Sequence, residues 1–360
     1  MLKCRLLMVL VLLISVNIWG SRPENLEKID AEQLGISVYF SSSPFLEKAK
    51  RTLAILQDAF ARQVVQQGFT APLGYQIYLS TTATGGAYTK RDALGIYSVI
   101  DPALSASLWE TYIHHEWQHA CQYAMGGPSS SLWMDEASAV LQEIIATPLS
   151  PYWLEGLKDF QGYPQAPLFS SEKYSTNYVY GGALFLLFLE EKYGAKDGQL
   201  VRRLWQKGEP WKTTLEEVTK SSLPNLVLDF ALWRIRAGAS YGAPGILKTR
   251  RLLKISDGPL LIHQEEMPYQ LGCFFIQHSV KNNPILLQIS VKSLLPKPSE
   301  RPLAIAWQII KKNQTFENNN NLTVYLQEEE EITIAICDLS EHLAFEKPEV
   351  HPIEVFLQRL

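Results

Sequence analysis

The amino-acid sequence predicts an α+β protein in which a mixed N-terminal part precedes an antiparallel β-sandwich. Strand-like segments and one amphipathic helix occupy the chain before residue 106, and helical periodicity dominates from there to about residue 253. Short apolar segments of strand length fill the remainder. The length of 360 residues and the 46% hydrophobic content suit two globular domains with well-filled cores.

The N-terminus has the features of a secretory signal. Lys3 and Arg5 precede an apolar run, residues 6–19, that is shorter than the roughly 20 residues a membrane-spanning helix needs. Small residues follow, so we expect residues 1–21 to be a signal peptide. The mature chain would then be secreted or periplasmic, with no stable membrane span. An uncleaved N-terminal anchor is the alternative.

The first elements of the mature chain follow from periodicity. Residues 44–67 have the apolar spacing of an amphipathic helix, which ends before Gly68. Short segments rich in β-branched and aromatic residues, bounded by turn formers, predict strands over residues 36–40, 75–80 and 95–101.

The C-terminal part contains apolar segments separated by turn-forming or charged residues, a spacing typical of an antiparallel sandwich. We expect a first domain over residues 22–255 and a β-sandwich domain over residues 256–360. The strands expected in the sandwich cover residues 285–292, 303–310, 322–326, 331–337 and 353–358.

Charge and cysteine content narrow the partners and the compartment. The 33 basic and 37 acidic side chains are mixed along the chain and form no basic stripe, so we expect no nucleic-acid partner. Cys273 and Cys337 lie in strand-like segments and would pair in an oxidising compartment, with two buried thiols as the alternative. Cys121 lies on an apolar helical stripe and is expected in the core.

The segment HHEWQH, residues 114–119, has the spacing of a metal-binding helix. His115 and His119 are four residues apart, so both imidazoles can reach one metal ion at about 2.0–2.1 Å. Glu116 lies roughly a quarter-turn away, where its carboxylate can take a proton from metal-bound water. His114 lies about 100° from the metal face and is expected to be a packing residue. An ordinary helical histidine pair is the alternative.

A second helix can supply the third ligand. The first helix can stop at residues 126–128, and Ser131 can cap a helix that begins LWMDEASAV. The helical rise then places Glu136 at nearly the depth of His119. Two histidines and one carboxylate leave a fourth position open for water. Asp135 is the rival ligand, and a surface position for Glu136 is the remaining alternative.

The pair HEWQH and WMDEASA resembles the gluzincin class of zinc metallopeptidases, and more narrowly the peptidase-MA-like proteins. Further segments, among them YQIYL, GIYSVIDP and YVYGGALFLLFLEEKYG, resemble a bacterial family of secreted proteins, assigned as metalloproteases, that ends in a β-rich module. The resemblance implies a zincin-like catalytic domain that hydrolyses protein or peptide substrates. It also implies Zn²⁺ held by His115, His119 and Glu136, a zinc-activated water, and Glu116 as general base.

Two further site assignments depend on this resemblance. Tyr180 is the first choice and Tyr178 the second for a donor that stabilises the oxyanion, with aromatic packing at a helix start as the alternative. The aspartate that often follows the ligand glutamate by three or four residues is replaced by Ala139 or Val140. Glu143 is a substitute, or else an exposed or helix-pairing residue.

Two other functions fit the same residues. One is a binding protein that keeps the zinc fold without turnover and uses the β-sandwich to hold a glycan or a protein. The other is a zinc hydrolase that acts on a non-peptide bond. Hydrolysis of a peptide library separates the first from a peptidase, and product analysis separates the second.

Overall fold

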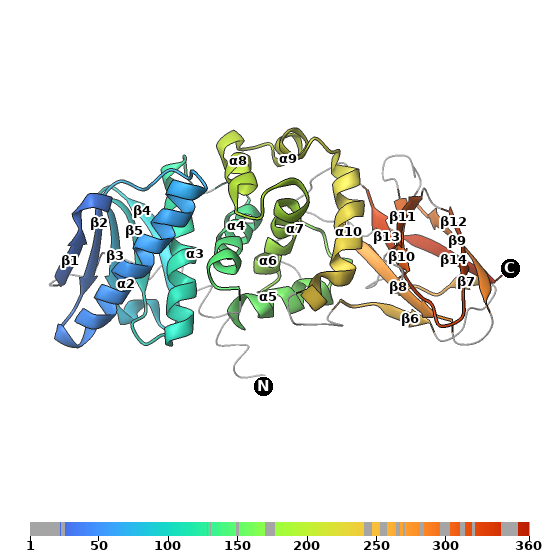
Figure 1. Cartoon of the computed structure of the whole chain (residues 1–360), viewed down its shortest axis with the longest axis horizontal. Helices are drawn as coiled ribbons and strands as arrows, with labels where there is room; N and C mark the ends of the chain where they lie inside the picture. The colour runs from blue at the N-terminus through green and yellow to red at the C-terminus, as the bar shows by residue number, and fades with distance from the viewer. Residues whose placement is uncertain are drawn as a thin grey trace.

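The computed structural model describes residues 22, 26–127, 129, 131–148, 151–169, 177–240, 247–252, 258–263, 267–268, 271–280, 284–295, 303–309, 314–318, 321–339 and 352–359. Helices occupy the middle of the molecule, and β-sheets lie at both ends (Figure 1). This arrangement agrees with the predicted α+β class. The predicted signal, residues 1–21, lies outside the described residues. Within them, no helix combines the length and the apolar character needed to cross a membrane.

The N-terminal sheet has the order β1-β2-β3-β5-β4. Its three central strands run parallel, and an antiparallel strand flanks them on each side. The strands predicted at residues 36–40, 75–80 and 95–101 are present. The strands are β1 (Glu27–Ala31), β2 (Ile36–Phe40), β3 (Tyr75–Leu79), β4 (Ala87–Asp92) and β5 (Gly95–Ile100).

The predicted helix over residues 44–67 is confirmed, with a change of winding near its end. Helix α2 (Leu46–Ala59) continues as a π-helix, η3 (Phe60–Gln66).

The two edge strands of the N-terminal sheet, β1 and β4, were not predicted. Strand β4, with the sequence AYTKRD, has no fully buried residue because it closes one edge of the sheet, where charged side chains discourage pairing with another chain.

The described middle of the chain is mostly helical, as the periodicity predicts, and contains eight helices. Helix α3 packs on one side against α2, β4 and β5 and on the other against α4, so it lies at the centre of the N-terminal half. The helices are α3 (Ala106–Ala124), α4 (Leu132–Ala146), α5 (Pro151–Gly162), α6 (Tyr178–Gly181), α7 (Ala183–Tyr193), α8 (Gln199–Lys207), α9 (Trp211–Thr219) and α10 (Leu223–Ser240).

The C-terminal strands form two sheets, with the orders β11-β10-β13-β8-β6 and β12-β9-β14-β7. All pairings within them are antiparallel except that β6 runs parallel to β8. All five predicted strands are present. The strands are β6 (Arg250–Leu252), β7 (Gly258–Leu260), β8 (Cys273–Ser279), β9 (Ile285–Ser293), β10 (Leu303–Ile309), β11 (Gln314–Asn318), β12 (Asn321–Leu326), β13 (Glu331–Asp338) and β14 (Ile353–Arg359).

The first of these sheets is covered on both faces. One face shares a hydrophobic cluster with the second sheet, in which Ile305 and Ile334 pack with Leu287. Phe275 and Ala335, from the same sheet, belong instead to the core of the helical part, where α10 packs against β10 and β13 (Figure 1). The expected boundary near residue 255 therefore falls between two parts of the chain that share buried surface.

The two C-terminal cysteines face each other across neighbouring strands. Cys273 and Cys337 are register partners on β8 and β13, both are buried, and their Sγ atoms lie 3.0 Å apart. Both are free thiols here, as is Cys121, which is fully buried in the core as expected. Whether Cys273 and Cys337 form a disulfide therefore depends on the redox state of these two adjacent thiols.

We expect mild oxidation to join Cys273 and Cys337 within one chain and to leave Cys121 reduced, because only the first two have a thiol neighbour at bonding reach among the described residues. Peptide mass mapping after alkylation of the unfolded protein measures this. Alkylation of all three cysteines after oxidation would contradict the prediction.

Candidate metal centre

Helix α3 combines a core-facing stripe with a polar face. Ile113, Trp117, Ala120 and Cys121 are fully buried, as the apolar spacing predicts. The Ser105 side chain accepts a hydrogen bond from the Leu108 backbone and caps the helix start. The stripe fixes the rotation of the helix and thereby the direction of the histidines on its other side.

A short connection turns the chain from α3 into α4. Gly126 and Gly127 have φ values of 133° and 111°, a region that suits glycine, and α3 ends at Ala124 just before them. Ser131 stands at the start of α4, but its side chain makes no capping hydrogen bond. Instead, the Ser129 backbone donates to the Asp135 carboxylate at 2.9 Å. The predicted helix start is right, and the predicted cap is wrong.

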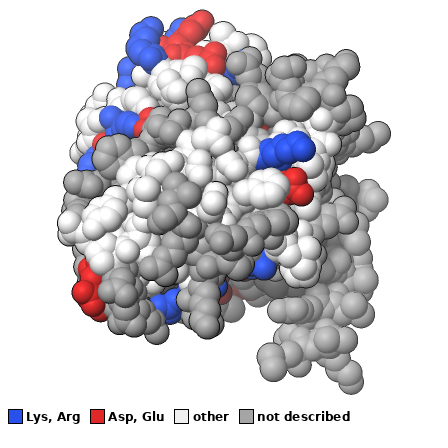
Figure 2. Space-filling view, turned by 90° about the vertical axis from the view of Figure 1, so that its right-hand side faces the viewer, with Lys and Arg blue, Asp and Glu red and all other residues white. Residues whose placement is uncertain are grey.

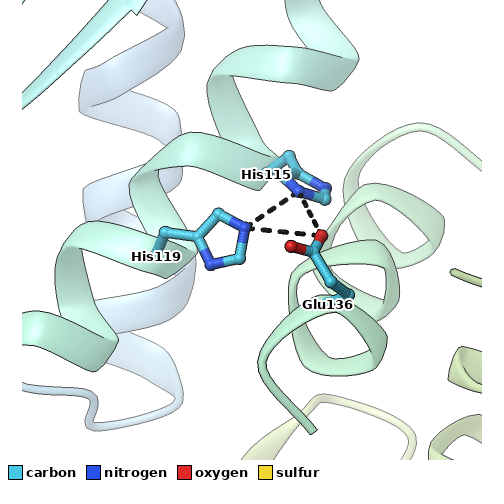
Figure 3. A group of neighbouring side chains, drawn as sticks. All are labelled: His115, His119 and Glu136. Carbon is cyan, nitrogen blue, oxygen red and sulfur yellow. Dashed lines mark hydrogen bonds and ion pairs between the residues drawn. The ribbon is translucent and has the colours of Figure 1, made fainter. Parts of the chain in front are cut away.

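His115, His119 and Glu136 converge, as Figure 3 shows. The Nε2 atoms of His115 and His119 lie 3.0 Å apart. Oε2 of Glu136 lies 3.3 Å from Nε2 of His115 and 3.7 Å from Nε2 of His119. Among the described residues, these three form the group whose ligand atoms could hold a metal ion, all within 4.8 Å of one another. Their side chains are 7%, 15% and 18% exposed, so solvent reaches the group.

The other nitrogen of His115 is held by a buried carboxylate. Its Nδ1 lies 2.5 Å from Oε1 of Glu143, whose side chain is fully buried. A carboxylate can only accept, so Nδ1 carries the proton when the ring is neutral. Glu143 therefore leaves the Nε2 lone pair of His115 directed at the other two ligand candidates.

Gln122 holds the outer nitrogen of His119, as Glu143 holds that of His115. Its Nε2 donates to the Asp135 carbonyl at 2.9 Å and to the Ser138 hydroxyl at 2.8 Å, which fixes the orientation of the amide. Oε1 of Gln122 must then face Nδ1 of His119, 2.7 Å away, and accept its proton. Nε2 of His119 is again the unprotonated nitrogen of the neutral ring.

Three electron-rich atoms thus converge on one point, and a cation is what such a cluster fits. Ligands at about 2.0–2.2 Å in tetrahedral geometry are separated from each other by about 3.3–3.6 Å. The observed separations of 3.0, 3.3 and 3.7 Å bracket that range. Two neutral imidazoles and one carboxylate, with their outer nitrogens hydrogen-bonded, form a donor set suited to Zn²⁺.

Without a bound cation, protons on the imidazole nitrogens would have to offset the repulsion between these three electron-rich atoms. Burial alone would lower the pKa of His115, but hydrogen bonds and charge from Glu136 and Glu143 outweigh it and raise that pKa well above the ordinary value. Burial would raise the pKa of Glu136, but the charges of His119 and His115 hold it below its ordinary range. A metal ion and the imidazole protons therefore compete for the same nitrogens.

The rival residues point elsewhere. Asp135 turns its carboxylate to the Ser129 backbone at the start of α4, and burial raises its pKa to about 6. His114 is almost fully buried on the side of α2, with Nε2 3.7 Å from Oδ2 of Asp58, and burial lowers its pKa to about 4. Neither belongs to the convergent group.

Glu116 lies beside the group rather than in it. Its side chain is buried, and burial raises the pKa of its carboxyl despite the nearby histidines. Thr89, on β4, donates a hydrogen bond to Oε2 of Glu116 at 2.6 Å. Glu116 is thus a buried carboxylate one residue after a candidate ligand and outside the candidate ligand group.

The two tyrosine candidates occupy different environments. The Tyr180 ring centroid lies 6.2 Å from that of His115, and the negative charge of Glu136 raises the pKa of its hydroxyl well above the ordinary value, which keeps the phenol protonated. The Tyr178 hydroxyl donates to the Pro167 carbonyl at 3.2 Å, and its ring packs against Phe160 in the core. The geometry favours Tyr180 over Tyr178 as a donor at the site.

Glu143 is the site residue whose role the sequence left open. The option of an exposed side chain is wrong. Helices α3 and α4 run antiparallel, so a residue later on α4 meets one earlier on α3: Glu143 contacts His115, whereas Asp135 contacts Gln122. The signal was its position seven residues after Glu136, which places both on one face of α4.

We expect Glu143→Gln to weaken zinc binding by about 10- to 100-fold without unfolding the protein, because the amide can still accept from His115 but carries no charge. Competition with a chromophoric chelator measures the affinity. Glu110→Gln is the control, since that residue lies on the exposed side of α3 with its side chain 44% exposed. Equal affinities for the two variants would contradict an outer-partner role for Glu143.

Comparison with known proteins does not add a family. The sequence matches no family model, and no curated protein matches it.

Proposed function

We propose that the chain is a secreted or periplasmic zinc metallopeptidase. The convergence of His115, His119 and Glu136, with the outer nitrogens of both histidines held by Glu143 and Gln122, is the observation that supports it most. The position of buried Glu116 beside that group supports a catalytic site over a purely structural metal site.

The proposal includes the finer fold assignment. An HExxH helix packed beside a mixed sheet, with an antiparallel edge strand next to that helix, supports a zincin-like domain. The shared hydrophobic cluster of the two C-terminal sheets supports a β-sandwich. Secretion is supported by the signal-like N-terminal sequence.

The roles of the chain's own groups follow from their chemistry. Bound zinc would supply a Lewis acid that lowers the pKa of water and polarises a peptide carbonyl. Glu116 would accept the proton that the attacking water loses and deliver it to the leaving amine. Tyr180 would donate a hydrogen bond from its protonated hydroxyl to the negative charge that develops on the carbonyl oxygen.

The test is metal-dependent hydrolysis of an unstructured protein such as casein. We expect activity in the purified mature chain, its loss after treatment with a strong zinc chelator, and its return when one equivalent of Zn²⁺ is added. Full zinc occupancy with no hydrolysis of casein or of a peptide library would overturn the proposal.

The outer face of the second C-terminal sheet favours one alternative, a zincin-fold binding protein for a glycan. Gln288 on β9 is the register partner of Thr323 on β12 and of Gln358 on β14, and Tyr325 on β12 is 57% exposed. Figure 2 looks onto the end of the molecule that carries these sheets; among the described residues it shows uncharged side chains between scattered Lys, Arg, Asp and Glu side chains. Neutral amides and hydroxyls beside an exposed aromatic ring suit a neutral sugar better than a charged ligand.

Hydrolysis and binding assays separate this alternative from the peptidase. Zinc occupancy with glycan binding and no turnover would favour the binding protein. Turnover of an ester or glycoside with peptides untouched would favour a zinc hydrolase of a non-peptide bond.

A further inference from the structure

A chain of hydroxyl groups connects the N-terminal sheet to Glu116. Thr89 Oγ1 lies 2.6 Å from Oε2 of Glu116 and 2.5 Å from the Ser98 hydroxyl. The Ser98 hydroxyl lies in turn 2.5 Å from that of Tyr75. Tyr75 and Ser98 are fully buried, so the chain runs from the interior of the sheet to the carboxylate.

Strand pairing explains why these residues meet. Thr89 and Ser98 are register partners on the antiparallel strands β4 and β5, so their side chains lie on the same face of the sheet. Ser98 is also the register partner of Ile77 on β3, and Tyr75, two residues earlier, shares that face. Helix α3 covers this face, since the Tyr75 ring packs edge-on against Trp117, with the two ring centroids 5.1 Å apart.

The direction of the hydrogen bonds follows from the groups at the two ends of the chain, the Glu116 carboxylate and the Tyr75 phenol. An ionised carboxylate and a carbonyl oxygen only accept, so the Thr89 proton goes to Glu116, whose Oε2 lies at 2.6 Å and whose backbone oxygen lies at 3.1 Å. The nearer, charged Oε2 is the stronger acceptor. Ser98 can then donate to Thr89, and Tyr75 to Ser98. Burial raises the pKa of Tyr75 far above its ordinary value, which keeps the phenol protonated and able to donate. Every hydroxyl proton points toward Glu116, an alignment in which each bond polarises the next.

We propose that Thr89, supported by Ser98 and Tyr75, is a positioning residue that holds the Glu116 carboxylate by Oε2 and leaves Oε1 for the proton of the attacking water. The catalytic part of this inference rests on the proposed peptidase function. The positioning part does not, because the hydrogen bonds belong to the chain itself. Without the Thr89 hydroxyl, a buried carboxylate would lose its donor and rotate among several orientations.

The positioning part is tested by the stability of the metal-free protein. The four proteins compared in urea are wild type, Thr89→Val, Glu116→Met and the double variant. We expect Thr89→Val to raise the unfolding equilibrium constant by about tenfold or more in the wild-type background. In the Glu116→Met background the factor should be clearly smaller, because only the contacts of Thr89 with the backbone oxygen of residue 116 and with Ser98 are then lost. Equal effects in the two backgrounds would overturn the inference.

The catalytic part is tested by turnover and by a conservative replacement. We expect Thr89→Val to lower kcat by about tenfold or more, with KM and zinc content within about twofold of wild type. Thr89→Ser keeps the hydroxyl and should keep kcat within about threefold. A Thr89→Ser variant as slow as Thr89→Val would overturn the positioning role. If the wild type hydrolyses nothing but Thr89→Val still destabilises the wild type more than the Glu116→Met variant, the peptidase proposal is wrong. The positioning of Glu116 by Thr89 is then still supported.

Discussion

Replacement of Glu116 by glutamine is expected to slow hydrolysis by about 100- to 10,000-fold while zinc binding stays at the wild-type level. A glutamine fills the same volume and can accept the Thr89 hydrogen bond through its carbonyl oxygen, but it cannot take a proton from water. Because Glu116 lies outside the ligand group, the three zinc-binding side chains keep their positions. The measurement is the initial rate of casein hydrolysis by zinc-loaded protein, together with zinc content by mass spectrometry.

The control for this variant is Glu110→Gln, on the same helix but with an exposed side chain. It removes one negative charge from α3 and should leave the rate within about twofold. If Glu116→Gln and Glu110→Gln retain the same rate, Glu116 is not the general base. If Glu116→Gln loses its zinc, the carboxylate would have to be reassigned to the ligand group.

The second large effect is expected at Glu136. Glu136→Gln should weaken zinc binding by more than the roughly 10- to 100-fold expected for an outer partner such as Glu143, because it removes the only negative charge among the three ligand atoms. Zinc that binds only the folded state at 100 times its dissociation constant stabilises a protein by about 2.7 kcal/mol. The wild type should therefore show an increase of several degrees in Tm on addition of zinc, and Glu136→Gln should show almost none.

The neighbouring carboxylate provides the matched control. Asp135→Asn changes the same charge one residue away, and Asp135 faces the Ser129 backbone instead of the histidines. We expect this variant to keep the increase in Tm caused by zinc. The opposite result, in which Asp135→Asn loses zinc and Glu136→Gln keeps it, would show that the rival residue is the ligand.

Local spacing was sufficient to predict the core of the candidate site. His115 and His119 lie on one helical face, and Ile113 and Trp117 fix the opposite face in the core, so the direction of the imidazoles follows from a period of 3.6 residues. Glu136 required one further step, the length of two helices on either side of a glycine turn. That step uses only the rise per residue, and the structure brings Glu136 to the predicted place.

The parts that the sequence did not predict depend on tertiary pairing. Strand β4 is polar because it lies at an edge, so it lacks the alternation that marks a half-buried strand, and Thr89 did not stand out. Its contact with Glu116 arises from the pairing of β4 with β5 and the packing of α3 on the sheet. Glu143 could be placed on a face of α4 but not paired with His115 until the antiparallel course of the helices was known.

The most direct measurement is a zinc-edge anomalous difference map from crystals of the zinc-loaded protein. The account predicts a single strong peak within about 2.0–2.2 Å of Nε2 of His115, Nε2 of His119 and a carboxylate oxygen of Glu136. A map without density among these three side chains, or with the zinc held by other residues, would contradict it.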